Sequence, residues 1–227
     1  MIKLENTVLP SPDQMRFIIE GMRNPMNSWD KSDSEIKYGL AYGLSEDSDE
    51  CYVKGHNLGV NDYSLMQRLS KAGTDHRKFM RMMSVYVRIT APLYWWKEFD
   101  TYKVGTVSNS CSTMHKIAEK EFTLDDFSHE HLSEGEWGNI NLLNSIITCL
   151  NVARSWFIKT KEKEFWWQMI QLLPSSYNQT RNVMFNYEVL ANIYHSRKNH
   201  KLDEWREFCK WIEELPLSDL ITHMGRK

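Results

Sequence analysis

Residues 172–199, LLPSSYNQTRNVMFNYEVLANIYHSRKN, decide how the second half of the chain folds. Pro174 ends the helix that the apolar residues of Phe165 to Leu173 predict, because proline has no N–H group to donate inside a helix. Asn186 is a good N-cap for a further helix over Tyr187 to Ser196, since its side chain can accept hydrogen bonds from free backbone N–H groups. The stretch therefore predicts two helices with a non-helical segment between them.

Upstream of this stretch, one segment has apolar residues at every second position, which is the period of a strand. Val85, Val87 and Ile89 alternate with polar neighbours, and alternation of β-branched residues predicts a strand. Pro92 follows, and proline is preferred at the first turn of a helix. The segment LYWWKEFDTYKV after it is therefore expected to begin a helix, and VGTVSNSCST beyond it a loop.

The rest of the chain is mostly helical in pattern. Apolar residues recur at helical spacing at Trp137, Ile140, Leu143, Ile146, Ile147, Leu150, Ala153 and Ile158, and again at Leu202, Trp205, Cys209, Ile212 and Leu215. Asn61 and Asp62 can cap an earlier helix that Gly73 ends, while the polar residues 28–50 predict loops around one short helix. We expect an α+β fold with a helix-rich C-terminal half, in one domain over 1–227. Its core is expected at 61–215, and the structure of 1–60 is left open.

Composition excludes several classes of protein. The 28 basic and 30 acidic residues give a net charge of −2, which gives no electrostatic basis for binding a nucleic-acid polymer. No secretory signal is visible, and no apolar run reaches the roughly 18 residues of a membrane span. The four widely spaced cysteines, Cys51, Cys111, Cys149 and Cys209, favour reduced thiols. We expect a soluble cytoplasmic protein.

The hydroxyl-rich segment Thr106 to Thr113 is a candidate phosphate-binding loop. Hydroxyl and backbone N–H groups often hold phosphates, and Lys103 could add a positive charge. The alternative is a plain loop. Cys111 could act as a nucleophile beside His115, but no acid is in place to orient the histidine, so an exposed or structural thiol is favoured.

Two further motifs favour structural roles. His129, Glu130 and His131 lack the HExxH spacing of a helical zinc site, so a surface turn is expected and no metal site is predicted. The pairs Trp95-Trp96 and Trp166-Trp167 cannot each form one stacking platform, because consecutive helical residues point about 100° apart. Core packing is expected for at least one member of each pair.

A polar set near the C-terminal half has two interpretations. Arginine suits bidentate recognition of a phosphate or a base edge, and amides can read polar ligands. A solvated helix face with Asn186 as its cap is the alternative. The set comprises Asn178, Arg181, Asn186, Asn192, Arg197 and His200.

Taken in chain order, these residues resemble the flavin-dependent thymidylate synthases, the ThyX family. The unit VYVRITAPLYWWKEF is similar to the family's strand, proline and helix ahead of its signature. Counted from Pro92, the family's Arg-His-Arg triplet falls on Thr101, Tyr102 and Lys103, and its serine falls on Cys111. Ser110 and Ser112 flank that position.

The stretch quoted first carries the strongest part of the resemblance. Counted from Pro174, the family's Asn, Leu, Asn and Arg fall on Asn186, Leu190, Asn192 and Arg197. A weaker likeness is the KAG segment that begins at Lys71. The resemblance covers roughly Lys71 to Asp203.

The resemblance implies a mixed α/β core with long helices and a homotetramer whose active sites lie between subunits. It also implies FAD as cofactor, dUMP or another pyrimidine deoxynucleotide as substrate, and reductive methylation. Methylenetetrahydrofolate would supply the carbon and NADPH would reduce the flavin. The flavin would carry the difficult chemistry, while the protein orients and polarises the base.

By the same resemblance, Arg197 would be the catalytic residue that contacts substrate and polarises the pyrimidine edge. Lys103, Asn186 and Asn192 would contact the flavin, and Ser110 or Ser112 would bind the substrate phosphate. The sequence departs from the family at the triplet, where lysine cannot make the forked contact of arginine, and at Asn109 and Thr113. Arg181 or Arg77 could compensate for the lost charge.

Three hypotheses follow from these observations. The first is a ThyX-like enzyme that methylates or otherwise modifies carbon five of a pyrimidine deoxynucleotide. The second is a divergent protein of this kind that binds a nucleotide or flavin without catalysis, as the altered triplet suggests. The third is a helical interaction module without a small-molecule site, supported by the aromatic-rich C-terminal half.

Overall fold

The computed structural model describes residues 1–42, 49–135 and 138–223. Its strands are β1 (Lys3–Val8), β2 (Glu35–Tyr42), β3 (Asp49–Asn57), β4 (Ser84–Pro92), β5 (Val107–Ser110) and β6 (Asn178–Asn186). Its α-helices are α1 (Pro12–Arg23), α2 (Val60–Lys71), α3 (Phe79–Met82), α4 (Leu93–Phe99), α5 (Asn139–Thr160), α6 (Lys163–Leu172), α7 (Tyr187–Arg197), α8 (Asp203–Glu213) and α9 (Asp219–Thr222). The α+β fold class predicted from the sequence is confirmed.

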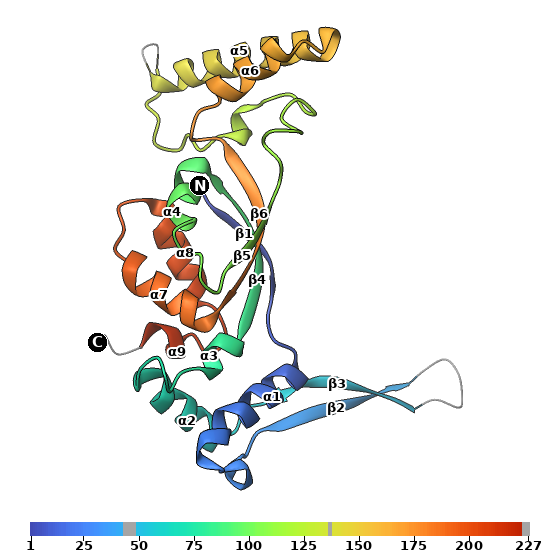
Figure 1. Cartoon of the computed structure of the whole chain (residues 1–227), viewed down its shortest axis with the longest axis vertical. Coiled ribbons are helices and arrows are strands. Elements are labelled where there is room, and N and C mark those ends of the chain that lie inside the picture. The colour runs from blue at the N-terminus through green and yellow to red at the C-terminus, as the bar shows by residue number, and fades with distance from the viewer. Residues whose placement is uncertain (43–48, 136–137, 224–227) are drawn as a thin grey trace.

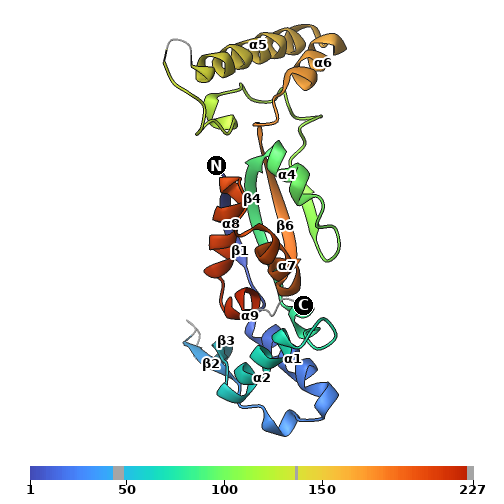
Figure 2. The ribbon, with the colours of Figure 1, turned by 90° about the vertical axis from the view of Figure 1, so that its left-hand side faces the viewer.

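The molecule is elongated, with three layers along its long axis (Figure 1). The α5–α6 pair lies at one end, a sheet with α4, α7 and α8 lies in the middle, and α1, α2 and the β2–β3 hairpin lie at the other end. Turned by 90°, the molecule shows α7 and α8 in front of the central strands (Figure 2). Among the described residues, no helix is long and apolar enough to cross a membrane.

The central sheet has four strands in the order β1-β4-β6-β5, and each neighbouring pair is antiparallel. Alternation in β4 buries Val85, Val87 and Ile89 and leaves Tyr86 and Arg88 exposed on the other face. The buried face packs against the helices, so one face of the sheet forms the core and the other remains open. The strand predicted from the period-two pattern is confirmed.

Two separate apolar clusters stabilise the chain. The larger one joins the sheet to α1, α4, α7 and α8, with Trp95, Trp96 and Trp205 each almost fully buried. The smaller one, around Leu150 and Met169, joins α5 and α6 to the segment that precedes them. Trp95 and Trp96 both pack in the core as expected, and of the second pair Trp166 packs, partly buried, against the smaller cluster.

The helices predicted for the C-terminal half are present, with small shifts at their ends. The amide oxygen of Asn186 accepts a hydrogen bond from the Val189 N–H at 3.0 Å, so Asn186 is the N-cap of α7 as predicted. Gly73 follows the end of α2 with a φ of 107°, a conformation that glycine adopts at low cost.

Four expectations are corrected by the structure. Residues 28–50 contain a short 3₁₀ helix at Trp29–Lys31, but also strand β2 and the first residues of β3. The expected loop after α4 contains the edge strand β5, and α4 ends at Phe99, before the TYKV segment. Asp62 is not a cap, because Gly59 holds that position and the Asp62 side chain is buried.

Candidate functional site

Polar side chains of β6 and α7 contact residues at or just after the C-terminal end of α4. We call this group the α4-end cluster and define it as Glu98, Asp100, Tyr102, Arg181 and Arg197. Glu98 belongs to α4, Asp100 caps its end, Tyr102 follows in the loop, Arg181 lies on β6 and Arg197 ends α7. Two arginines are thereby held by carboxylates two positions apart on one helix end.

Arg197 is fixed on three sides. Its Nε donates to the Tyr102 hydroxyl at 2.9 Å, and its Nη1 donates to Glu98 Oε2 at 2.8 Å. The guanidinium also lies over the Trp205 ring, 4.8 Å from its centroid, where a cation is attracted to the aromatic face. Trp205 Nε1 donates to the same Glu98 oxygen at 2.9 Å. Glu98 therefore holds Arg197 and the ring beneath it together.

Arg181 is arranged in a parallel way. Its Nη1 donates to Asp100 Oδ1 at 2.7 Å, and its Nε donates to Gln179 Oε1 at 2.9 Å. Its guanidinium lies 4.2 Å from the centroid of the Trp96 ring. Ser110 on β5 is the register partner of Arg181 on β6. The antiparallel pairing thus places Ser110, a predicted phosphate-binding residue, beside Arg181. This arginine could supply the positive charge that the altered triplet lacks.

The loop between α4 and β5 lies against the start of α7. A Cβ atom on Gly105 would approach Asn186 Nδ2 to 3.1 Å and Val189 Cγ2 to 3.0 Å, and the φ of Gly105 is 75°. Only glycine fits this close approach without strain. The next residue, Thr106, has a buried hydroxyl without a hydrogen-bond partner among the described residues. An unsatisfied buried hydroxyl is rare in native proteins and calls for an explanation.

Several solved structures share this architecture. A structure of thymidylate synthase X from Helicobacter pylori with FAD and dUMP matches with a TM-score of 0.64 at 14% identity, over 98% of this chain and 97% of that chain. The chain has the ThyX fold. A second structure of the Helicobacter pylori enzyme with FAD and dUMP gives a TM-score of 0.62 at 14% identity, over 99% of both chains.

A further ThyX-like match is the UMP/dUMP methylase PolB from Streptomyces cacaoi bound with 5-Br dUMP. Its TM-score is 0.55 at 11% identity, over 99% of this chain and 95% of that chain. No protein-family model and no curated protein matches the chain. At these identities, the matches establish the ThyX fold and leave the activity to be argued from the residues.

The other positions aligned with the ThyX signature are more dispersed. Lys103 is exposed in the loop after Tyr102. Asn192 is exposed on α7, about a third of a turn around the helix from Asn186 and Arg197. The Ser112 hydroxyl accepts a hydrogen bond from the His115 N–H at 2.9 Å. Asn186 caps the N-terminal end of α7 and Arg197 ends the helix, so these two residues lie at opposite ends of α7.

The remaining candidates have separate partners. Cys111 is exposed, and Arg77 pairs with Glu188 at 3.0 Å. His129 Nδ1 lies 2.8 Å from the Phe127 carbonyl oxygen, while His131 Nε2 lies 3.0 Å from Asp203 Oδ2. Within the described ranges, no group of three or more His, Cys, Asp and Glu side chains is arranged to hold a metal ion.

Sequence reasoning missed two members of the α4-end cluster and the aromatic ring beneath Arg197. Glu98, Asp100 and Trp205 are ordinary helix residues in the sequence, and Glu98 contacts Arg197 across 99 positions of chain. The only available signal was the aromatic-rich helix after Pro92, which placed this segment beside the ThyX signature.

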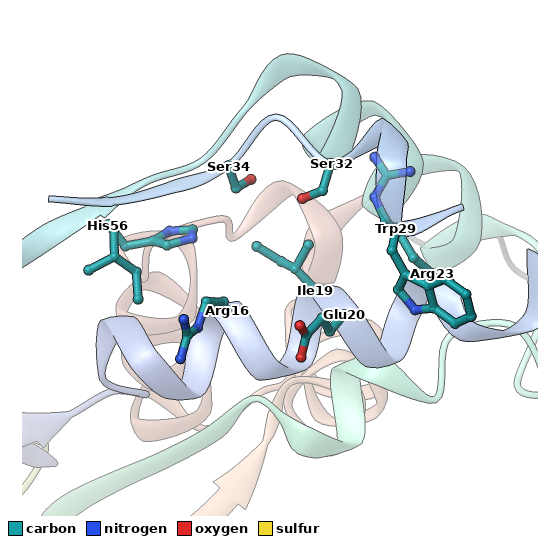
Figure 3. A pocket seen from close by; sticks show the side chains of 9 residues that line it. Arg16, Ile19, Glu20, Arg23, Trp29, Ser32, Ser34 and His56 are labelled. Atoms are coloured by element: carbon teal, nitrogen blue, oxygen red, sulfur yellow. The ribbon is translucent and has the colours of Figure 1, made fainter. Parts of the chain in front are cut away.

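A second candidate lies at the far end of the molecule, between α1 and the start of β2 (Figure 3). This cavity of about 200 Å³ has Arg16, Glu20 and His56 on its walls. Burial lowers the pKa of His56, although the charge of Asp62 acts in the opposite direction. Arg23 is neutralised by Asp62, so Arg16, Glu20 and a neutral imidazole leave this cavity with little net charge.

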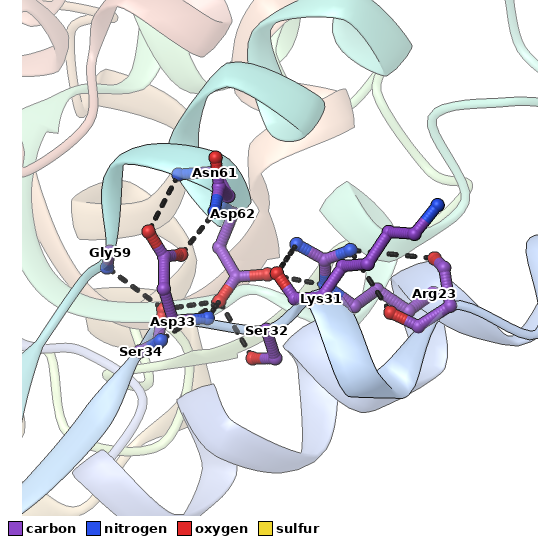
Figure 4. A network of polar contacts seen from close by, with 9 residues as sticks. Arg23, Lys31, Ser32, Asp33, Ser34, Gly59, Asn61 and Asp62 are labelled. Atoms are coloured by element: carbon purple, nitrogen blue, oxygen red, sulfur yellow. Dashed lines mark hydrogen bonds and ion pairs between the residues drawn. The ribbon is translucent and has the colours of Figure 1, made fainter.

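The wall of this cavity rests on a buried polar network (Figure 4). Arg23 Nε donates to Asp62 Oδ1 at 2.5 Å, and its other nitrogens donate to the Ser28 and Lys31 carbonyl oxygens at 3.1 and 3.0 Å. The Ser32 and Ser34 hydroxyls donate to Asp62 Oδ2 at 2.8 and 2.6 Å. Every group is satisfied within the chain, which indicates a structural role.

Asp33 ties the same network to the start of α2. Its carboxylate accepts hydrogen bonds from the Asn61 N–H at 2.9 Å and the Asp62 N–H at 3.1 Å, and the Gly59 N–H donates to the Ser34 hydroxyl at 2.9 Å. A carboxylate at this position satisfies free N–H groups at the positive end of the helix. The β2–β3 hairpin is therefore closed at its base by contacts between residues 33–34 and 59–62.

Proposed function

We propose that this chain is a ThyX-like enzyme that binds FAD and a pyrimidine deoxynucleotide such as dUMP at the α4-end cluster and methylates or otherwise modifies carbon five of the base. The observation that carries the proposal is that Arg197, with Tyr102 as its hydrogen-bond partner, and Arg181 are each anchored to a carboxylate at the C-terminal end of α4. The first two align with the ThyX signature, and Ser110 pairs in register with Arg181. The ThyX fold adds support.

The residues present fit these ligands in chemical type. Arg197 offers fixed N–H donors to the oxygen edge of a pyrimidine, with its orientation set by Glu98 and Tyr102. Ser110 and Arg181 suit the phosphate. A bound flavin would supply the redox chemistry, and Asn186, Asn192 and Lys103 would hold it.

The unsatisfied hydroxyl of Thr106, in the loop against Asn186, supports a polar ligand there. Methylenetetrahydrofolate as carbon donor, NADPH as reductant and a homotetrameric assembly complete the proposed reaction system.

One observation favours a second candidate, namely binding without catalysis. Arg181 and Arg197 are both paired with carboxylates of this chain, and the position of the ThyX triplet carries Thr101, Tyr102 and Lys103. Asp100 and Glu98 compete with a phosphate for the arginines, which weakens the binding of a dianion. The helical interaction module remains the third hypothesis.

The visible absorption spectrum of the purified protein tests the first proposal. FAD is added with and without dUMP, excess flavin is removed by gel filtration, and retained flavin is measured. We expect retained flavin absorption, and oxidation of the reduced flavin that depends on the deoxynucleotide and methylenetetrahydrofolate. Retained flavin without such oxidation would favour the binding protein.

A matched pair of variants ties the result to the site. Arg197→Ala should lower dUMP affinity, whereas Lys198→Ala, which removes the neighbouring exposed cation, should not. If no flavin is retained even with dUMP, the flavin-dependent enzyme is excluded, and the two non-catalytic hypotheses, a nucleotide-binding protein and a helical interaction module, are favoured.

A further inference from the structure

A cavity lies where the segment that precedes α5 meets the end of α5 and the start of α6. The two helices form one end of the molecule (Figures 1 and 2). We call this space the α5–α6 cavity; its volume is about 340 Å³, which is enough for a small ligand. Its lining residues are Met114, His115, Ile117, Ala118, Phe157, Lys161, Lys163 and Trp166. None of them belongs to the α4-end cluster, so the cavity is a separate candidate for a ligand.

Side chains of both helices hold the walls of the α5–α6 cavity together. Trp166 Nε1 donates to the Met114 carbonyl oxygen at 2.9 Å, and Arg154 Nε donates to the Ala118 carbonyl oxygen at 3.0 Å. Between these two contacts, Ile117 is buried in the smaller apolar cluster. Contacts between distant parts of the chain therefore fix the walls, and ligand sites are usually formed in advance in this way.

Every ionisable side chain on the walls of the α5–α6 cavity is basic. These side chains are Lys161, Lys163 and His115, and the other lining residues are apolar. Glu162 and Glu164 alternate with the lysines in the sequence, but they do not line the cavity. The cavity therefore presents at least two positive charges and no negative charge to a ligand.

Other lysines at this end of the molecule pair with carboxylates. Lys116 pairs with Glu119, and Lys120 pairs with Asp126. In the part of the chain that the structure describes, no carboxylate forms an ion pair with either lysine of the cavity. Their positive charges are therefore available to an anion that enters from solvent.

Lys161 has a backbone conformation that lysine seldom adopts. It is the C-cap of α5, with a φ of 62° and a ψ of 12°, and its N–H donates to the Phe157 carbonyl oxygen at 2.9 Å. Glycine or asparagine takes this left-handed position at lower cost. Unfavourable conformations that a fold retains are concentrated at functional sites. Here the unfavourable residue carries a cation on the wall of a cavity, with its Nζ 6.0 Å from the centroid of the Phe157 ring.

The two kinds of lining residue define the chemistry of the ligand. Lysine suits a phosphate as a point charge, and aromatic side chains suit the flat face of a ring. Inorganic phosphate would leave the apolar wall uncovered, and a neutral ring would leave the lysines without an anion. We propose that the α5–α6 cavity binds an aromatic phosphate monoester such as a purine nucleotide. The ring lies against Phe157 and Trp166, and the phosphate lies among Lys161, Lys163 and His115.

Isothermal titration of the full chain with AMP tests the proposal, with adenosine and inorganic phosphate as the two halves of the probe. AMP should bind, and each half should bind at least about tenfold more weakly, because each engages only one kind of lining residue. Absence of AMP binding, or equal binding of AMP and inorganic phosphate, would overturn the proposal.

A matched set of variants ties the binding to the two lysines. The double variant Lys161→Gly, Lys163→Gln should weaken AMP binding at least about tenfold. Glycine is favoured at the left-handed position, so the urea midpoint should not fall and the loss cannot be assigned to unfolding. Lys159→Gln removes an exposed lysine of α5 that does not line the cavity and should leave AMP binding unchanged. Equal effects of the two changes would contradict the proposal.

Lysine acetylation locates the bound probe without a substitution. At a limiting dose of acetic anhydride, AMP should slow the modification of Lys161 and Lys163, but not that of Lys159, as measured by mass spectrometry of proteolytic peptides. Arg197→Ala should keep this protection, and its loss in that variant would place AMP at the α4-end cluster and overturn the proposal. Flavin retention reports on the proposed function separately, because the lysine variants should retain flavin as the wild type does.

Discussion

Two arginines of this molecule each pair with a carboxylate, yet their surroundings differ. Arg23 and Asp62 are 4% and 0% exposed, and backbone carbonyls and serine hydroxyls complete their hydrogen bonds. Arg197 and Glu98 are 19% and 36% exposed, and their other partners are a tyrosine hydroxyl and the Trp205 indole. The first pair is enclosed by the chain, whereas the second is open on one side.

The difference shows how one ion pair can serve the fold and another a ligand. Removing a partner from an enclosed pair leaves a buried charge without compensation, which is strongly destabilising. An open pair contributes little to stability because water screens it. The geometry of an open pair can therefore be determined by the ligand that it recognises. The aromatic rings beneath Arg197 and Arg181 hold both guanidinium groups in place.

The largest expected effect is at the enclosed pair. Asp62→Ala should lower the free energy of unfolding by about 3–5 kcal/mol, because Arg23 would remain buried and unpaired. Glu98→Ala should lower it by about 1 kcal/mol or less. Urea unfolding followed by circular dichroism measures both. Equal losses would remove the distinction between the two pairs.

Low pH should destabilise the protein through the Arg23–Asp62 pair, because the contacts of Asp62 lower the pKa of its carboxyl group. Burial alone would raise the pKa of Asp62, but hydrogen bonds from Ser34, Ser32 and Arg23 outweigh burial and hold the pKa below its usual 3.8. A carboxyl with a lowered folded-state pKa stabilises the protein above the unfolded value, and this contribution is lost as the pH falls through the folded-state pKa.

The unfolding free energy should therefore fall as the pH drops below 3.8. The slope should be shallower in Asp62→Asn than in the wild type. Urea midpoints measured from about pH 6 down to about pH 3 would show this difference.

At the open pair the effect should be on binding. Arg197→Ala should weaken dUMP binding at least about tenfold, and Arg197→Lys should restore little of it, because lysine cannot make two parallel contacts. Isothermal titration with dUMP measures both variants. Full rescue by lysine would mean that Arg197 supplies only charge and not a fork.

The smallest effect separates two roles of Asn186. Asn186→Ala should lower the free energy of unfolding by about 1 kcal/mol, because the α7 cap is lost. The same variant should also retain less flavin. Asn186→Ser keeps a capping oxygen, so it should retain most of the stability while flavin retention still falls. If the serine variant binds flavin normally, Asn186 is a cap and nothing more.

The elements around Val85 and Asn186 were predictable because local patterns determine them. Alternating β-branched residues form β4, and a capping asparagine begins α7 whatever lies nearby. The β2–β3 hairpin was missed because its polar residues resemble a loop. Its base is closed by Asp33, a long-range contact that no local pattern signals.

Only some residues of the candidate site could be predicted from the sequence. The ThyX resemblance, counted from Pro174, predicted roles for Asn186 and Arg197, which lie in one continuous segment. Glu98 reaches Arg197 only after the sheet and helices have packed, and its sequence neighbourhood is that of an ordinary amphipathic helix. Ion pairs across long chain separations depend on tertiary packing, which a single sequence does not encode as a pattern.

The contacts of Asp33 and Ser34 with the start of α2 have a consequence for how this chain tolerates changes in length. They join the two ends of the β2–β3 hairpin independently of what lies between them. Each doubling of a flexible connection adds only about 0.6 kcal/mol of closure entropy. An insertion between the two strands should therefore leave α1, α2 and the central sheet in place, which makes this hairpin a suitable position for a fused peptide or a reporter domain.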